Sequence, residues 1–148
     1  KAINFDKTVA AVQGAKSLGF RVRTSWILDM PNSTEEGILA TFKAIEDLET
    51  PEIRLHYLTL RLGSELNNAY SQITEQFIHN GTQNLNISGV SDEFIKTHVQ
   101  SLLLRLQSKG YTVVKNAEDF LKVEEIKQTN PELKIVSLCP LRYGLNWE

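Results

Sequence analysis

The segment from Arg21 to Glu36 constrains the fold of this chain more than any other. Residues 21–30 are rich in valine, threonine, tryptophan and isoleucine, which predicts a β-strand that Pro31 closes. Ser33 then reads as a helix N-cap, and Glu36 completes a capping box three residues later. A strand that leads through a tight turn into a capped helix is the building unit of parallel α/β folds.

The same alternation continues along the chain. Further strands are predicted at 52–62, 111–114 and 133–138. In the strand at 52–62, alternation places Ile53, Leu55 and Tyr57 on one face and Arg54 and His56 on the other. Apolar stripes at helical spacing lie between and before the strands, among them Ile38, Phe42 and Ile45, the stretch 66–77, and Ile95 and Val99. Ser91 is predicted to begin a helix that has acidic residues in its first turn, and Asn116 to cap the helix that follows residues 111–114. This order favours parallel βαβ units. The polar, glycine-bearing stretch at 80–90 is the predicted boundary between barrel-like units in residues 1–80 and an appended α/β extension in residues 81–148. The predicted fold class is therefore α/β, a half parallel barrel with a small C-terminal extension.

Composition excludes several classes of protein. The 148 residues include 41% hydrophobic and 23% charged side chains, which suits a domain with a buried core. The net charge of −2 gives no reason to expect nucleic-acid binding, and no apolar run is long enough to span a membrane. The single cysteine, Cys139, cannot form an internal disulfide, and no signal peptide is evident, so we expect a cytoplasmic protein. The helical pattern that begins almost at Lys1 suggests a fragment boundary.

Ligands of parallel α/β proteins bind at the carboxyl ends of the strands. At the first such end, Asp29 is a candidate acceptor for a ribose hydroxyl or an amine, and the backbone N–H groups of residues 33–35 are candidates to hold an anion. The alternative is that Asp29 and Ser33 only organise the turn. At the second end, Arg61 is a candidate clamp for a substrate carboxylate, or else an exposed partner of Glu65.

The other reactive side chains form no recognisable constellation. His56, His79 and His98 lack metal-ligand spacing with one another or with Cys139. There is no glycine-rich phosphate loop and no nucleophile elbow. We therefore predict no metal site and no catalytic residue within this chain.

Residues 1 to about 66 resemble the later part of the radical S-adenosylmethionine (SAM) core. Ala15-Lys-Ser-Leu-Gly-Phe-Arg-Val resembles the helix–glycine–strand junction of that family. Ile27-Leu-Asp-Met-Pro, followed by Thr34-Glu, is similar to its fifth-strand motif, and Leu60-Arg-Leu-Gly-Ser-Glu to the end of its sixth strand. Two departures are that Asp29 stands where the family often has glycine, and Ser64 where it has threonine. The three-cysteine loop of the family would precede Lys1.

The resemblance implies an enzyme that cleaves SAM reductively with a 4Fe–4S cluster and uses the 5′-deoxyadenosyl radical on a small-molecule or peptide substrate. By the same resemblance, the residues bordering the cofactor would be Trp26, Ile27, Leu28, Asp29, Leu58 and Leu60, with Arg61 on the substrate side. The chain alone would be non-catalytic and would bind neither SAM nor the cluster. We also expect that its open sheet edge could lead it to self-associate.

Two other interpretations stay open. One is a non-catalytic α/β module that binds a ligand or a partner, because every motif also has a structural explanation. The other is a barrel enzyme for phosphorylated metabolites, with phosphate at the helix start near Ser33.

Overall fold

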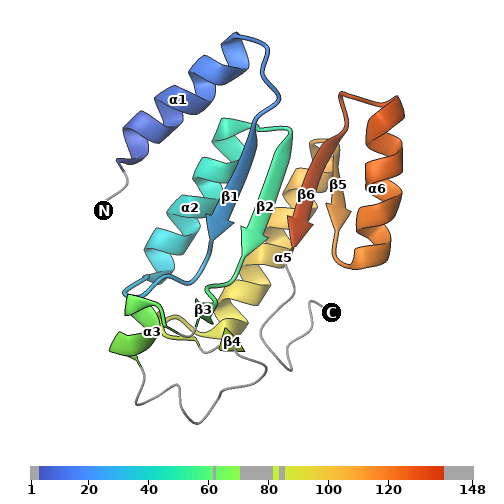
Figure 1. Cartoon of the computed structure of the whole chain (residues 1–148). Coiled ribbons are helices and arrows are strands. Elements are labelled where there is room, and N and C mark those ends of the chain that lie inside the picture. The colour runs from blue at the N-terminus through green and yellow to red at the C-terminus, as the bar shows by residue number, and fades with distance from the viewer. Residues whose placement is uncertain (1–3, 62, 71–81, 84–85, 139–148) are drawn as a thin grey trace.

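Four parallel strands form the central sheet of the protein. The computed structural model describes residues 4–61, 63–70, 82–83 and 86–138. The strands of the sheet are β1 (Arg23–Ile27), β2 (Glu52–His56), β5 (Tyr111–Val114) and β6 (Lys134–Leu138). Their order across the sheet is β1-β2-β6-β5, and every neighbouring pair is parallel (Figure 1). The predicted α/β class is confirmed.

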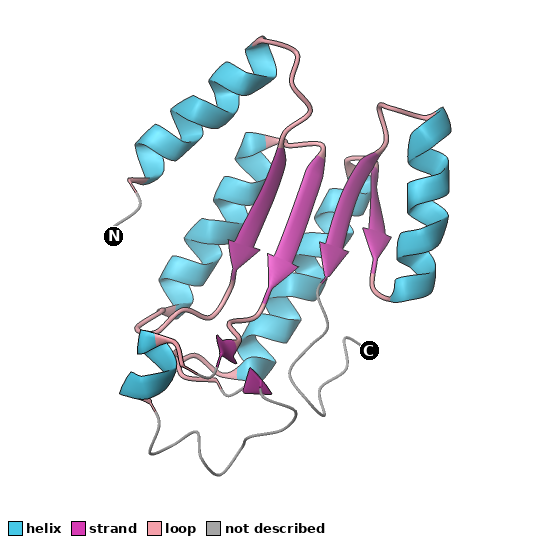
Figure 2. Ribbon diagram, viewed as in Figure 1, coloured by secondary structure: helices cyan, strands magenta, loops and turns pink. Residues whose placement is uncertain are grey.

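Helices cover the sheet unequally. The helices are α1 (Phe5–Ser17), α2 (Glu35–Leu48), α3 (Glu65–Ala69), α5 (Asp92–Ser108) and α6 (Ala117–Thr129). The apolar sides of α2 and α5 pack on one face of the sheet, whereas α6 packs on the other face, against β5 and β6 (Figure 2). Over β1 and β2, that second face is not covered by any helix among the described residues (Figure 2).

Strands from both predicted domains belong to this one sheet. Strand β6, from the predicted extension, pairs with β2, from the predicted barrel part, and lies between β2 and β5. The larger core cluster also draws on both parts: Phe42 and Leu55 pack with Val99, Leu102 and others of α5. The described part of the sheet is open, and closure into a barrel remains a proposal.

The strand predicted at 52–62 is wrong in extent. Strand β2 ends at His56, and after an irregular stretch the chain forms a separate two-stranded antiparallel sheet from β3 (Leu60–Arg61) and β4 (Thr82–Gln83). Strand β2 ends here because its neighbour β1 ends at Ile27. The last backbone hydrogen bond between the two chain segments runs from Leu28 N–H to the His56 carbonyl. Among the described residues, no parallel strand lies beside the chain beyond that point, so β2 does not continue there as an interior strand.

Two of the three helix starts named from the sequence are confirmed. Ser91 and Asn116 cap α5 and α6 as predicted, each accepting the backbone N–H three residues on. The predicted N-cap Ser33 is wrong by one residue, since Thr34 caps α2 by accepting from Gly37 N–H at 3.1 Å. Asn32 has φ 63°, and the turn it forms commits the Ser33 N–H to the Met30 carbonyl. The helical stripe predicted over 66–77 is realised in α3 only to Ala69, and residues 71–81 lie outside the described part of the chain.

Candidate functional site

The carboxyl ends of β1 and β2 meet around a fully buried carboxylate. Asp29 has no exposed surface, and its Oδ1 accepts the backbone N–H of Leu58 at 2.5 Å. This bond replaces the strand pairing that ends at Leu28, so it holds the two chain segments together where the β-ladder stops. The side chain thus turns toward β2 and into the protein, rather than into the space outside the strand ends.

Two further titratable groups lie at this end of the molecule. Burial, followed by the charge of Asp92, raises the pKa of Tyr57 above its ordinary value. Burial also raises the pKa of Asp92, although a hydrogen bond of 2.9 Å from Asn86 Nδ2 partly offsets that effect. Perturbed groups at the carboxyl ends of parallel strands are candidates for a functional site. We name Asp29, Tyr57 and Asp92 the carboxyl-end cluster.

Sequence patterns did not single out Tyr57 or Asp92. Asp92 was explained completely as an acidic residue in the first turn of a helix, and Tyr57 as one member of an alternating strand. The sequence separation of 35 positions carries no signal that the two charges interact. Only the packing of α5 against the sheet brings the start of this helix to the end of β2.

The predicted cofactor-bordering residues lie on two sides of the sheet. Leu28 is buried in the core beneath the helices, and Trp26 packs against that core with its indole N–H donated to Thr24 Oγ1. Ile27 points to the opposite face and is 48% exposed. Leu58 and Leu60 are both buried. Of this set, Ile27 is the side chain open to a ligand.

The substrate candidate Arg61 lies in β3, outside the parallel sheet. Its backbone pairs with Thr82 of β4, and its side chain lies outside what the structure describes. Glu65 is exposed in the first turn of α3. Whether Arg61 binds a carboxylate or pairs with Glu65 therefore remains a prediction.

Polar residues occupy the sheet face that no described helix covers. Arg23, Ser25 and Ile27 of β1 are exposed there, and Arg54 and His56 of β2 are half-buried. Burial, and then the charge of Arg54, lowers the pKa of His56. Alternation along the strand predicts that Arg54 and His56 lie on the opposite face from Ile53 and Leu55. The packing of α2 and α5 on Ile53 and Leu55 decides that Arg54 and His56 face outward.

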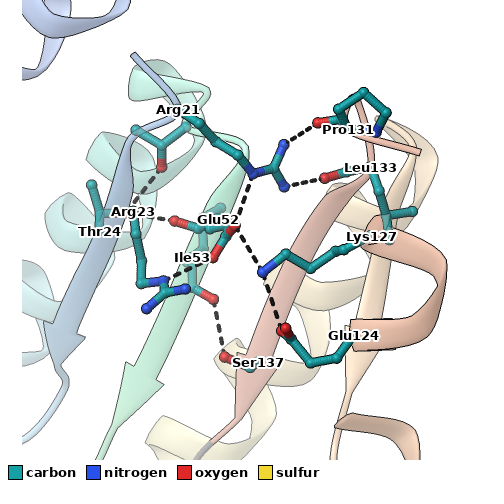
Figure 3. A network of polar contacts seen from close by, with 11 residues as sticks. Arg21, Arg23, Thr24, Glu52, Ile53, Glu124, Lys127, Pro131, Leu133 and Ser137 are labelled. Atoms are coloured by element: carbon teal, nitrogen blue, oxygen red, sulfur yellow. Dashed lines mark hydrogen bonds and ion pairs between the residues drawn. The ribbon is translucent and has the colours of Figure 1, made fainter. Parts of the chain in front are cut away.

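The opposite, amino-terminal end of the sheet carries a dense polar network (Figure 3). Glu52 receives Arg21 Nε at 2.8 Å, Arg23 Nε at 2.7 Å and Lys127 Nζ at 3.2 Å. Burial alone would raise the pKa of Glu52, but the three cations outweigh it and lower the pKa to about 2. Arg21 also donates to the carbonyls of Pro131 and Leu133, so the network ties β1 and β2 to the segment before β6. These groups satisfy one another, which indicates a structural role.

The described residues offer no group of three histidine, cysteine, aspartate or glutamate side chains able to hold a metal. Of the residues with metal-ligand chemistry, His98 stacks on Phe94 and bonds to its carbonyl, whereas His79 and Cys139 lie outside the described part. One cysteine in the whole chain does not fit a cluster that needs three. None of the described helices is long and apolar enough to cross a membrane.

The side chain of Asp29 is buried against Leu58, so it does not project into the space outside the end of β1. Comparisons with models of protein families, with curated proteins and with solved structures find no match to this chain.

Proposed function

We propose that this chain supplies the later strands of a radical SAM enzyme, with the cluster held by another part of a longer protein. The observation that carries the proposal is the resemblance of residues 1 to about 66, together with the unit that the motif at Ile27 builds. There, a parallel strand leads through a tight turn into a capped helix, and the next strand, β2, is its neighbour. When SAM and a reduced 4Fe–4S cluster are bound, such an enzyme would use one electron from the cluster to cleave SAM into methionine and a 5′-deoxyadenosyl radical, which abstracts a substrate hydrogen.

The roles of this chain in that reaction are to bind, orient and exclude water. Helices α2 and α5 would form the outer layer, which leaves Ser25, Ile27 and His56 on the inner face toward the ligand space. The bond from Leu58 N–H to Asp29 would hold the two strand ends at a fixed separation beside the adenine. Ile27, 48% exposed, would provide apolar contact to the nucleoside.

The direct test uses the longer protein, reconstituted with iron and sulfide without oxygen and then reduced in the presence of SAM. We expect three cysteines in the radical SAM spacing upstream of Lys1, and 5′-deoxyadenosine and methionine as products. A parent protein without those cysteines, or one that leaves SAM intact, would rule out the proposal.

A second test concerns the residues of this chain and reads binding instead of turnover. Ile27→Glu should weaken SAM binding to the reconstituted protein at least tenfold by equilibrium dialysis, because it places a charge against the nucleoside. Leu39→Glu is the matched control, since Leu39 has a similar exposed fraction of 43% but lies on α2. Equal affinities for the two variants would remove Ile27 from the site.

The alternative is a non-catalytic module that binds a small polar ligand at the carboxyl-end cluster. Asp92 favours it, because this half-buried carboxyl group lies in the first turn of α5 close to the carboxyl end of β2, which is a usual ligand position. This alternative predicts that the present chain alone binds a ligand, and that Asp92→Asn changes its affinity. The radical SAM proposal predicts instead that binding needs the longer protein.

A further inference from the structure

A row of polar side chains crosses the face of the sheet that no described helix covers. In the register of the parallel strands, Ser25 of β1 lies beside Arg54 of β2, and Arg54 lies beside Ser137 of β6. Residues paired in this way project from the same face, and neighbouring strands lie about 4.8 Å apart. We call these three residues the Arg54 row. His56 follows Arg54 by two positions and therefore projects from the same face.

The guanidinium of Arg54 has no acceptor in the described part of the chain. Arg54 is half-buried, yet no described carboxylate or carbonyl accepts a hydrogen bond from it. Arg21 and Arg23 differ, because both donate to Glu52. A guanidinium carries five N–H donors, and partial burial removes some of its water without supplying another acceptor. An anionic ligand would supply the acceptors that the described residues do not.

The surroundings of the Arg54 row are positively charged. Two residues before Arg54 on the same face lies Glu52, whose carboxylate is shared by three cations (Figure 3). One of them, Lys127, also pairs with Glu124, but the cations of this network still outnumber its carboxylates. Arg54 adds a further positive charge, and burial, followed by that charge, lowers the pKa of His56. An anion bound at the row would therefore lie in a favourable field.

The row is open on the side of β1 and closed on the side of α6. Toward α6, a cavity whose lining includes Arg54, Ser137 and Val123 has a volume of about 20 Å³, which holds about one water molecule. The hydroxyl of Ser137 also donates to the Ile53 carbonyl at 3.4 Å (Figure 3). Toward β1, Ser25 is exposed, and no described residue bonds to its hydroxyl. A ligand would therefore lie over β1 and β2, beside Arg54 and Ser25.

These donors suit a carboxylate or a phosphate group. The planar fork of an arginine binds two oxygens of such a group at once, and a serine hydroxyl can donate to one of them. A single arginine without an acceptor matches one anionic group of a small molecule, whereas a polyanion such as nucleic acid is bound by many cations along its length. His56 would border the ligand on the side of the carboxyl ends of the strands.

We infer that Arg54, together with the Ser25 hydroxyl, binds the carboxylate or phosphate group of a small-molecule substrate on the uncovered face of the sheet. The inference rests on the proposed function, in which this face is the inner one, and deepens it by giving the substrate an anionic group. The substrate would lie farther from the strand ends than the nucleoside at Ile27, whose register partner is His56. The two ligands could thus be bound side by side along β1 and β2.

Titration of the present chain with inorganic phosphate, and separately with acetate, tests the site by NMR at an ionic strength held constant with chloride. The ring signals of His56 should shift and saturate with at least one of the two anions. Arg54→Gln should weaken that binding by about tenfold or more, and Ser25→Ala by about threefold. Arg54→Lys keeps the charge but loses the fork, so its affinity should lie between. Arg105→Gln is the matched control and should bind like the wild type, because Arg105 lies on α5 and pairs with Glu46.

The two anions distinguish the sources of the ligand group. Tighter binding of phosphate would indicate a phosphorylated substrate, and equal or tighter binding of acetate a carboxylate, and either result supports the site. The absence of a saturable shift with both anions, or equal affinities of the wild type and Arg54→Gln, would overturn it. Because the titration needs neither SAM nor a cluster, its failure is distinguishable from failure of the proposed function, which SAM cleavage by the longer protein tests.

Thermal unfolding gives a second readout. Without added anion, Arg54→Gln should not lower the melting temperature, because it removes one positive charge from a group of cations and breaks no bond to a described residue. The anion that binds should raise the melting temperature of the wild type and of Arg105→Gln, but not that of Arg54→Gln. A lower melting temperature of Arg54→Gln without anion, or an equal rise in all three proteins, would assign Arg54 a structural role and contradict the site.

Discussion

The carboxylate of Asp29 accepts the backbone N–H of Leu58 at 2.5 Å, and this bond joins the ends of two parallel strands. Leu58 is the second residue beyond β2, where its N–H has no strand partner of its own. A buried N–H without an acceptor destabilises the folded protein. The Asp29 side chain supplies the acceptor that a backbone carbonyl of a longer β1 would otherwise supply. Glycine, which is common at this position in the family that the sequence resembles, has no side chain to accept this N–H.

Asp29→Ala should destabilise the protein by about 2–3 kcal/mol, because it removes a buried acceptor and leaves the Leu58 N–H without it. Asp29→Asn, which retains an acceptor oxygen, should lose less. Urea unfolding followed by circular dichroism measures both. Asp47→Ala is the control, since Asp47 is exposed and pairs with Lys43 one helical turn away. A loss for Asp29→Ala as small as that for Asp47→Ala would show that the bond is dispensable.

Glu52→Gln should lower stability at neutral pH and remove part of the acid sensitivity. The pKa of Glu52 lies at about 2 in the folded protein against an ordinary 4.5, so its stabilisation is complete above about pH 5 and is lost as the pH falls toward 2. We expect the free energy of unfolding to fall by about 2 kcal/mol at pH 7. This value is reduced because solvent screens the interaction of Glu52 with the exposed Arg23. At pH 2, where Glu52 is about half protonated in the folded protein, most of the difference in midpoint urea concentration between wild type and variant should be gone.

The control for this measurement is Glu118→Gln. Glu118 pairs with Lys122 at 2.7 Å, but both side chains are exposed, so the change should be under about 0.5 kcal/mol at every pH. A constant difference between Glu52→Gln and wild type from pH 7 to pH 2 would contradict the role of the Arg21–Arg23–Lys127 group.

Thr34→Ala should cost about 1 kcal/mol, because it removes the side-chain acceptor for the Gly37 N–H at the start of α2. Ser33→Ala should cost less, since the structure assigns Ser33 a backbone bond to Met30 and no capping role. Thermal unfolding of the two variants compares the N-cap read from the sequence with the one in the structure. A larger effect of Ser33→Ala would restore the capping box that the sequence predicted.

Leu102→Ala should destabilise the whole chain by about 2–5 kcal/mol while unfolding stays a single transition. Leu102 is fully buried where α5, from the predicted extension, packs on the core that β2 and α2 share. Leu104→Ala, at a position 68% exposed on the same helix, is the matched control and should change little. Two separate transitions in calorimetry would instead support the predicted division near residues 80–90.

Much of the local structure followed from the sequence. Ser91 and Asn116 were recognisable as N-caps because capping is settled within three residues of the cap. The stripes of Ile38, Phe42 and Ile45, and of Ile95 and Val99, identified the buried sides of α2 and α5, since a helix has one apolar side whatever it packs against. The parallel α/β class followed from the alternation of these elements.

The tertiary structure alone decided three features. It placed β6 between β2 and β5, because strand order depends on where the crossover helices pack and not on the sequence of any one strand. It ended β2 at His56, because a strand continues only as far as its neighbour does. It brought Tyr57 near Asp92 and placed Glu52 among Arg21, Arg23 and Lys127, which are long-range contacts that no local periodicity encodes. N-caps and helical stripes depend on residues a few positions apart, so a short stretch of sequence predicts them. The long-range contacts depend on how the helices pack on the sheet.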